Sequence, residues 1–155
     1  MFNLRCCFLV LSFFIMVSLY FLFNWFPFKY AEYINSDLFD RLLILSIINV
    51  ESSFSEDAIS PLGAYGLMQI MPETSKWLNE KFKTNYNVYN PIDNLNLGIM
   101  YLEYLYKRSG SLEKALVDYN TGPYSKEEIR KDAGGRYLSK VKKVYRIYRF
   151  LYRGD

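Results

Sequence analysis

The stretch LLILSIINVESSFSEDAISPLGAYGLMQIMP, residues 42–72, indicates the fold class and contains the first candidate for chemistry. It begins with an apolar run, broken by only two polar residues before Glu51. Ile44, Ile47 and Ile48 have the spacing of one face of an α-helix, and Glu51 continues that face. The stretch therefore predicts a buried helix that carries a carboxylate in its last turn.

Helical spacing also dominates the chain on both sides of this stretch. We expect helices at 37–51 with Ser36 as N-cap, at 72–82, at 94–108, at 112–119 with Ser111 as N-cap, and at 136–152. The pair Gly134-Gly135 is expected to break the chain before the last of these helices. No segment alternates as a strand would. The predicted class is all-α, with the helix at 37–51 in the centre of a bundle because it is apolar on nearly every side.

The carboxylate of Glu51 has two interpretations. Burial penalises the charged form and raises the pKa of a carboxyl group, as a general acid near neutral pH requires. Alternatively, Glu51 caps a neighbouring helix or pairs with a lysine. The periodicity alone favours this structural interpretation.

The first 28 residues differ in composition from the rest. No charged residue occurs from Cys6 to Phe28, which is about the length that a helix needs to cross a bilayer. We predict a signal anchor at 1–28, a short stem at 29–36 and a catalytic domain at 37–155, with Arg5 on the cytoplasmic side. A cleaved signal peptide is the alternative, although bulky aromatic residues follow the apolar run where a peptidase requires small ones.

Composition narrows the chemistry. The chain has 155 residues, a net charge of +3 and no histidine, and its only cysteines are the adjacent pair Cys6-Cys7. Histidine-dependent triads are therefore excluded, and we expect neither a metal site nor a cofactor. Basic residues crowd the last helix. A solvated face is the default interpretation, and attraction to anionic lipid or wall polymers is the alternative. Nucleic acid is not an expected partner.

Four segments occur in a characteristic order. They are ESSF from Glu51, SPLGAYGLMQIMP from Ser60, ALVDYNTGP from Ala115 and YLSKVKKVY from Tyr137. This series resembles the soluble-type lytic transglycosylases, which share the goose-type lysozyme fold. The likeness runs from about Leu38 to about Tyr148.

The resemblance implies cleavage of the β-1,4 bond between N-acetylmuramic acid and N-acetylglucosamine in peptidoglycan. It implies that one glutamate, matching Glu51, first protonates the glycosidic oxygen. The same carboxylate then takes the proton of the C6 hydroxyl while a 1,6-anhydro ring closes. It also implies that neither water nor a second carboxylate is needed.

The resemblance further assigns substrate-binding roles to a set of side chains and turns. Matching positions are Ser60, Gly66, Met68, Gln69, Met71, Tyr119, Asn120 and Tyr137. Ser60 would steer the carboxylate or an N-acetyl group, Gln69 would line the cleft between methionine walls, and Tyr137 would reach back toward Glu51. Taken singly, each position is an ordinary turn or core residue.

One departure leaves the reaction type open. The family pattern has a small residue where this chain has Asp118, and a second acid could activate water and give hydrolysis. Residues adjacent on a helix point about 100° apart, so we expect Asp118 to face away from the sugar if Tyr119 faces it. Three possibilities stay open: a membrane-anchored lytic transglycosylase outside the cytoplasm, a muramidase on the same fold, and a non-catalytic peptidoglycan-binding scaffold with envelope partners.

Overall fold

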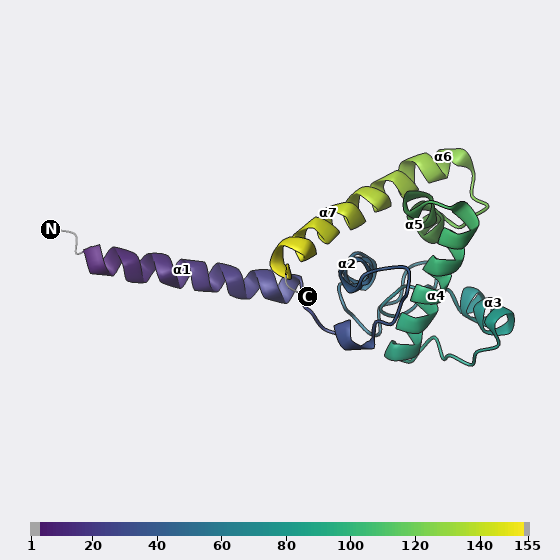
Figure 1. The fold of residues 1–155 in the computed structure, drawn as a ribbon, viewed down its shortest axis with the longest axis horizontal. Coiled ribbons are helices and arrows are strands. Elements are labelled where there is room, and N and C mark those ends of the chain that lie inside the picture. The colour runs from purple at the N-terminus through teal and green to yellow at the C-terminus, as the bar shows by residue number, and fades with distance from the viewer. Residues whose placement is uncertain (1–3, 154–155) are drawn as a thin grey trace.

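The computed structural model describes residues 4–153, with side chains from Phe8 onward. The expected position of Arg5 on the cytoplasmic side therefore concerns a side chain outside the described part. One long helix, α1 (Leu4–Trp25), projects from a helical domain, and the end of the last helix, α7 (Gly135–Leu151), returns to the point where α1 joins that domain (Figure 1). Apart from two isolated bridges at Tyr65, the described residues form no strand. The all-α prediction is confirmed.

Eight further helical segments build the domain. In chain order they are η1 (Ala31–Tyr33), α2 (Arg41–Ser52), α3 (Pro72–Phe82), α4 (Pro91–Ser109), α5 (Leu112–Thr121), α6 (Glu127–Ile129), the π-helical η2 (Arg130–Gly134) and α7 (Gly135–Leu151). Figure 1 shows α2 in the middle, with α7 crossing on one side and α4 standing on the other.

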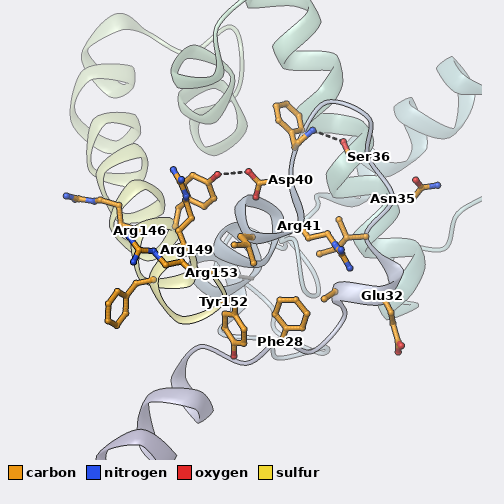
Figure 2. A pocket seen from close by; sticks show the side chains of 16 residues that line it. Phe28, Glu32, Asn35, Ser36, Asp40, Arg41, Arg146, Arg149, Tyr152 and Arg153 are labelled. Carbon is orange, nitrogen blue, oxygen red and sulfur yellow. Dashed lines mark hydrogen bonds between the residues drawn. The ribbon is translucent and has the colours of Figure 1, made fainter. Parts of the chain in front are cut away.

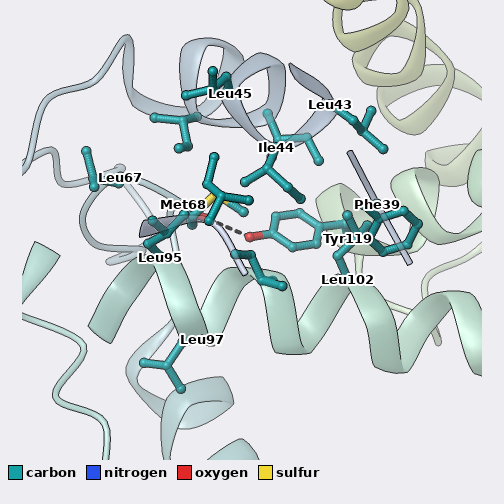
Figure 3. Packing of buried hydrophobic residues seen from close by; sticks show 14 of the residues in the cluster. Phe39, Leu43, Ile44, Leu45, Leu67, Met68, Leu95, Leu97, Leu102 and Tyr119 are labelled. Atoms are coloured by element: carbon teal, nitrogen blue, oxygen red, sulfur yellow. Dashed lines mark hydrogen bonds between the residues drawn. The ribbon is translucent and has the colours of Figure 1, made fainter. Parts of the chain in front are cut away.

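Helix α2 is the centre of the core, as its composition predicts. Every residue from Leu43 to Ile48 is buried. Figure 3 shows Ile44 of α2 facing α4, with the ring of Tyr119 between the two helices. Burying one such aliphatic side chain contributes about 1.5–3 kcal/mol. The hydrophobic effect therefore fixes the position of the helix that ends next to Glu51.

Two helix starts differ from the prediction. Helix α2 begins at Arg41, because Asp40 accepts a hydrogen bond from the backbone N–H of Leu43 and so takes the N-cap role. Ser36 instead accepts from two backbone N–H groups in the preceding turn. Helix α4 begins at Pro91, three residues earlier than expected. Asn90 caps it, and proline at the first helical position needs no hydrogen-bond partner for its nitrogen.

The predicted break at Gly134-Gly135 is wrong. Both glycines keep right-handed helical dihedral angles, and α7 follows η2 directly. A Cβ on Gly134 would lie 2.7 Å from the side chain of Val117. This glycine therefore permits close packing of η2 on α5, and does not end a helix.

The segment predicted as a short stem, residues 29–36, packs on the domain. Tyr30, Ala31 and Ile34 are buried core residues. The buried core of the described structure therefore includes residues that the prediction placed before the catalytic domain.

An aromatic junction holds the end of α1 to the end of α7. It consists of Phe23, Phe26, Phe28, Tyr148 and Tyr152, whose rings contact one another, with Phe28 and Tyr152 stacked at a centroid distance of 4.6 Å. The hydroxyl of Tyr148 donates to the carbonyl of Pro27 at 2.9 Å, and that of Tyr152 donates to the carbonyl of Phe26 at 2.7 Å. These contacts fix where the helix leaves the domain.

Candidate active site

Glu51 lies in the last turn of α2, beside the N-terminal part of α7. Its side chain is half-buried, and its Oε1 accepts a 2.6 Å hydrogen bond from the hydroxyl of Tyr137. Burial raises the pKa of the Glu51 carboxyl to about 7, and the hydrogen bond from Tyr137 opposes that rise. No ion pair joins Glu51 to a lysine or arginine among the described residues. The structural alternative, a helix cap or lysine pair, is therefore not what the structure shows.

Two buried tyrosines surround this carboxyl group. Burial is the main cause that raises the pKa values of Tyr119 and Tyr137 well above the ordinary value, and the nearby charge of Glu51 raises both further. Both rings therefore keep their hydroxyl protons at neutral pH. Tyr137 donates to Glu51, whereas Tyr119 donates to the backbone carbonyl of Met68 at 2.8 Å. This second bond is the dashed line in Figure 3.

A loop of about 20 residues leads from Glu51 to α3. Ser52 ties its far part to α2 by donating to the carbonyl of Leu67 at 3.0 Å. Ser60 shapes its middle, because its Oγ accepts from the backbone N–H groups of Leu62 and Ala64. The hydroxyl of Ser60 makes no hydrogen bond to Glu51, so the steering role stays a prediction.

Gln69 is a structural residue of this loop. Its backbone lies in the left-handed region at φ +48°, and its Nε2 donates to the carbonyls of Ala58 and Gly66 at 3.0 and 2.9 Å. The amide nitrogen is therefore occupied within the protein. Only Oε1 has no hydrogen-bond partner among the described residues, which limits the predicted cleft-lining role of Gln69 to accepting a hydrogen bond.

The two methionines differ. The side chain of Met68 is fully buried, so the prediction that it forms an open cleft wall is wrong. It packs in the core, and Gly98 of α4 accommodates it because a Cβ there would lie 2.5 Å from Met68. Met71 is half-buried at the N-cap of α3, and its predicted contact with sugar stays a prediction.

Asn94 is the residue that the sequence analysis missed. It is fully buried and bonds to three backbone groups: it accepts from the N–H of Met68 and donates to the carbonyls of Tyr65 and Val88. Gly66 lies directly on it, since a Cβ at Gly66 would be 2.7 Å from Nδ2 of Asn94. Gly66, assigned to substrate approach, thus serves first to let the loop close over this amide.

Asp118 and Asn120, the residues before and after Tyr119, lie in different surroundings. Asp118 is buried and forms an ion pair with Arg130. Asn120 is exposed and makes no hydrogen bond within the described residues. The structure thus brings Glu51, Tyr119 and Tyr137 together, whereas Asp118 is bound to a cation and Asn120 is open to a ligand.

Comparison with known proteins identifies the class. The family model described as the transglycosylase SLT domain matches residues 30–142, so the chain belongs to this family. The match begins at residue 30, where the buried core also begins.

The relatives in sequence are named as transglycosylases. The chain is 32% identical over 129 residues to a membrane-bound lytic murein transglycosylase C of Histophilus somni, covering 72% of this chain and 35% of that protein. It is 35% identical over 85 residues to the soluble lytic murein transglycosylase of Escherichia coli K12, covering 51% of this chain and 13% of that protein. The chain thus spans about a third or less of the length of these relatives.

Solved structures of lytic transglycosylases are similar in fold to this chain. The 70 kDa soluble lytic transglycosylase of Escherichia coli superposes with a TM-score of 0.74 at 25% identity, covering 86% of this chain and 26% of that one. An inactive mutant of the lytic transglycosylase Slt of Pseudomonas aeruginosa gives a TM-score of 0.71 at 26% identity, over 83% and 25% of the two chains. The lysozyme-like fold prediction is confirmed.

Proposed function

We propose that the chain is a peptidoglycan lytic transglycosylase that cleaves the bond between N-acetylmuramic acid and N-acetylglucosamine and forms a 1,6-anhydro end. The observation that carries the proposal is the half-buried Glu51, with the pKa of its carboxyl raised to about 7 and the hydroxyl of Tyr137 bonded to it. Such a carboxyl is protonated in a large fraction of molecules at neutral pH and can also act as a base after giving its proton away. Membership of the family supports the choice of substrate.

The reaction has two steps at this one side chain. Protonated Glu51 donates its proton to the glycosidic oxygen as the bond from that oxygen to C1 of muramic acid breaks. The resulting carboxylate then removes the proton from the C6 hydroxyl while O6 bonds to C1. Glu51 ends protonated, and no water enters. Tyr137 holds the carboxyl in place and stabilises its ionised form between the two steps.

The substrate contacts proposed for the other residues follow from the hydrogen-bonding groups that each does not use within the described structure. Asn120 is exposed and unbonded, so its amide can bind an N-acetyl group. Gln69 can accept through Oε1, and Ser60 can donate its hydroxyl proton. Tyr119 supports the loop from beneath through Met68 and does not bind sugar through its hydroxyl.

The test is mass spectrometry of peptidoglycan digested by the full chain, in parallel with Glu51→Gln. We expect anhydro ends from the wild type and a loss of at least about a hundredfold in the variant, because general acid catalysis contributes about 10²–10⁴-fold. Reducing ends that carry one added water would identify a muramidase. An absence of product from the folded wild type would favour a scaffold.

We also propose that α1 anchors the protein in a membrane, with the domain outside the cytoplasm. The segment Phe8–Trp25 has a mean hydropathy of 2.0 and is not buried by the domain. The junction packs its end tightly against α7, as a retained helix would require. Extraction of membranes at alkaline pH should leave the protein in the pellet. Release into the supernatant as a shortened chain would show instead that the segment is a cleaved signal peptide.

A further inference from the structure

A groove lies away from Glu51, where α1 meets the domain. It has a volume of about 970 Å³ and runs between the η1–α2 segment and the end of α7. Figure 2 shows Arg41 from one side and Arg146, Arg149 and Arg153 from the other around it.

The arginines of this groove carry uncompensated charge. None of the four forms an ion pair with a carboxylate within residues 4–153. Two acids also line the groove. Asp40 is already used, since it caps α2 and accepts from the hydroxyl of Tyr145, which leaves Glu32 as the one unbonded acid in the lining. The groove therefore has an excess of guanidinium groups, which suit the geometry of phosphate oxygens.

The end of the groove next to α1 is lined by aromatic rings. Phe28 and Tyr152 line it and stack on each other, and Tyr152 also contacts Phe23 of α1. Phe150, which lines the groove, and Trp25, at the end of α1, expose 73% and 72% of their surface. Exposed aromatic residues at the end of an apolar helix are typical of the membrane interface.

We propose that this groove binds the phosphate headgroup of an anionic phospholipid from the bilayer that α1 enters. The arginines contact the phosphate, and the aromatic rings contact the upper part of the acyl chains. The inference goes beyond glycan cleavage and rests on the membrane-anchor proposal. The bound lipid would hold the end of α7 against the membrane surface.

The test measures lipid retained by the purified full chain in neutral detergent, using native mass spectrometry. Phosphatidylglycerol and phosphatidylcholine are supplied in equal amounts. The double variant Arg146→Gln/Arg149→Gln is compared with Lys140→Gln/Lys143→Gln, which removes the same charge from exposed positions of the same helix outside the groove. We expect the wild type and the lysine variant to retain phosphatidylglycerol preferentially, and the arginine variant to retain at least fivefold less.

Three results would overturn the proposal. Equal losses in both variants, or no preference for phosphatidylglycerol, would show that no specific groove site exists. Displacement of the lipid by excess inorganic phosphate, down to the level of the arginine variant, would assign the site to free phosphate. Cleavage of solubilised glycan is measured on the same samples and should be unchanged in the arginine variant. Failure of the lipid site is thereby distinguished from failure of the enzyme.

Discussion

The hydroxyl of Tyr137 donates a 2.6 Å hydrogen bond to Oε1 of Glu51, which lies 86 residues earlier in the chain. The bond joins the end of the central helix α2 to the start of α7. Tyr137 is buried and Glu51 is half-buried, and the pKa of the Glu51 carboxyl is raised by this burial and lowered by the hydrogen bond from Tyr137. The pair therefore governs both the stability of the fold and the pH range of the proposed reaction.

Replacing Glu51 by glutamine should stabilise the protein above neutral pH. The pKa of Glu51 is about 7 in the folded chain against an ordinary value of 4.5, so between these pH values the unfolded chain loses this proton first. Glu51 therefore makes folding less favourable as pH rises through this window, by about 1–3 kcal/mol once pH exceeds 7. Chemical unfolding of Glu51→Gln and wild type at pH 5 and pH 8 checks this. The advantage should be large at pH 8 and small at pH 5.

The exposed carboxylate Glu80 on α3 provides the control. Glu80→Gln should change stability equally at both pH values. A Glu51→Gln protein that is no more stable than wild type at pH 8 would show that the carboxyl is not held in a dry environment.

Tyr137→Phe should move the alkaline fall of activity to higher pH. The lost hydrogen bond favours the ionised form of Glu51, so its removal raises the pKa of that carboxyl further. The maximal rate should fall about tenfold or more, because a hydrogen bond to a charged group contributes about 1.5–3 kcal/mol. A pH–rate profile on soluble glycan measures both effects.

Tyr119→Phe is the matched comparison, since that hydroxyl bonds to the backbone of Met68 and not to Glu51. It should lower stability by about 1 kcal/mol and leave the profile in place. A shift to lower pH in Tyr137→Phe would contradict the role assigned to that hydroxyl.

Asn94→Ala should be among the most destabilising substitutions in the domain. It leaves the N–H of Met68 and the carbonyls of Tyr65 and Val88 without partners, and each orphaned buried group costs about 1–3 kcal/mol. We expect a loss of about 3 kcal/mol or more in chemical unfolding. Asn96→Ala, two residues further on α4 and without a hydrogen bond among the described residues, should change stability by about 0.5 kcal/mol or less. Similar losses of stability in both variants would contradict the role of Asn94 in holding these three backbone groups together.

Asp118→Asn distinguishes transglycosylation from hydrolysis. Asp118 is bound to Arg130, so its replacement should reduce stability by about 1–3 kcal/mol and leave the anhydro product unchanged. Asp132→Asn breaks an exposed pair with Arg136 and should cost about 1 kcal/mol or less. Disappearance of reducing-end products in Asp118→Asn, seen by mass spectrometry, would instead assign that acid to hydrolysis.

Much of the fold follows from local pattern. Apolar spacing predicted α2 as a central helix, and Ser111 and Pro72 marked helix starts correctly. The errors come from residues with two roles. The helix expected at 94–108 begins earlier because Asn90 is its cap and Pro91 its first residue, and Gly134 was interpreted as a breaker although it serves close packing.

The site was harder to predict because its support is long-range. The segment order pointed to Glu51 and Tyr137, and the structure places them in contact. Periodicity gave no reason to expect that Asn94 holds the loop by hydrogen bonds, or that the amide nitrogen of Gln69 donates to backbone carbonyls. The sequence alone does not show whether the amide of an asparagine or glutamine faces solvent or bonds within the core. That depends on where backbone groups from distant parts of the chain lie.

Helix α7 connects the two ends of this molecule. Tyr137 stands near its start, and Tyr148, bonded to the segment that follows α1, lies about three turns, or about 16 Å, further along. If α1 is a membrane anchor, as proposed, this helix keeps the carboxyl of Glu51 at a fixed short distance from the membrane surface. Under that proposal the enzyme would reach only the glycan strands next to the bilayer.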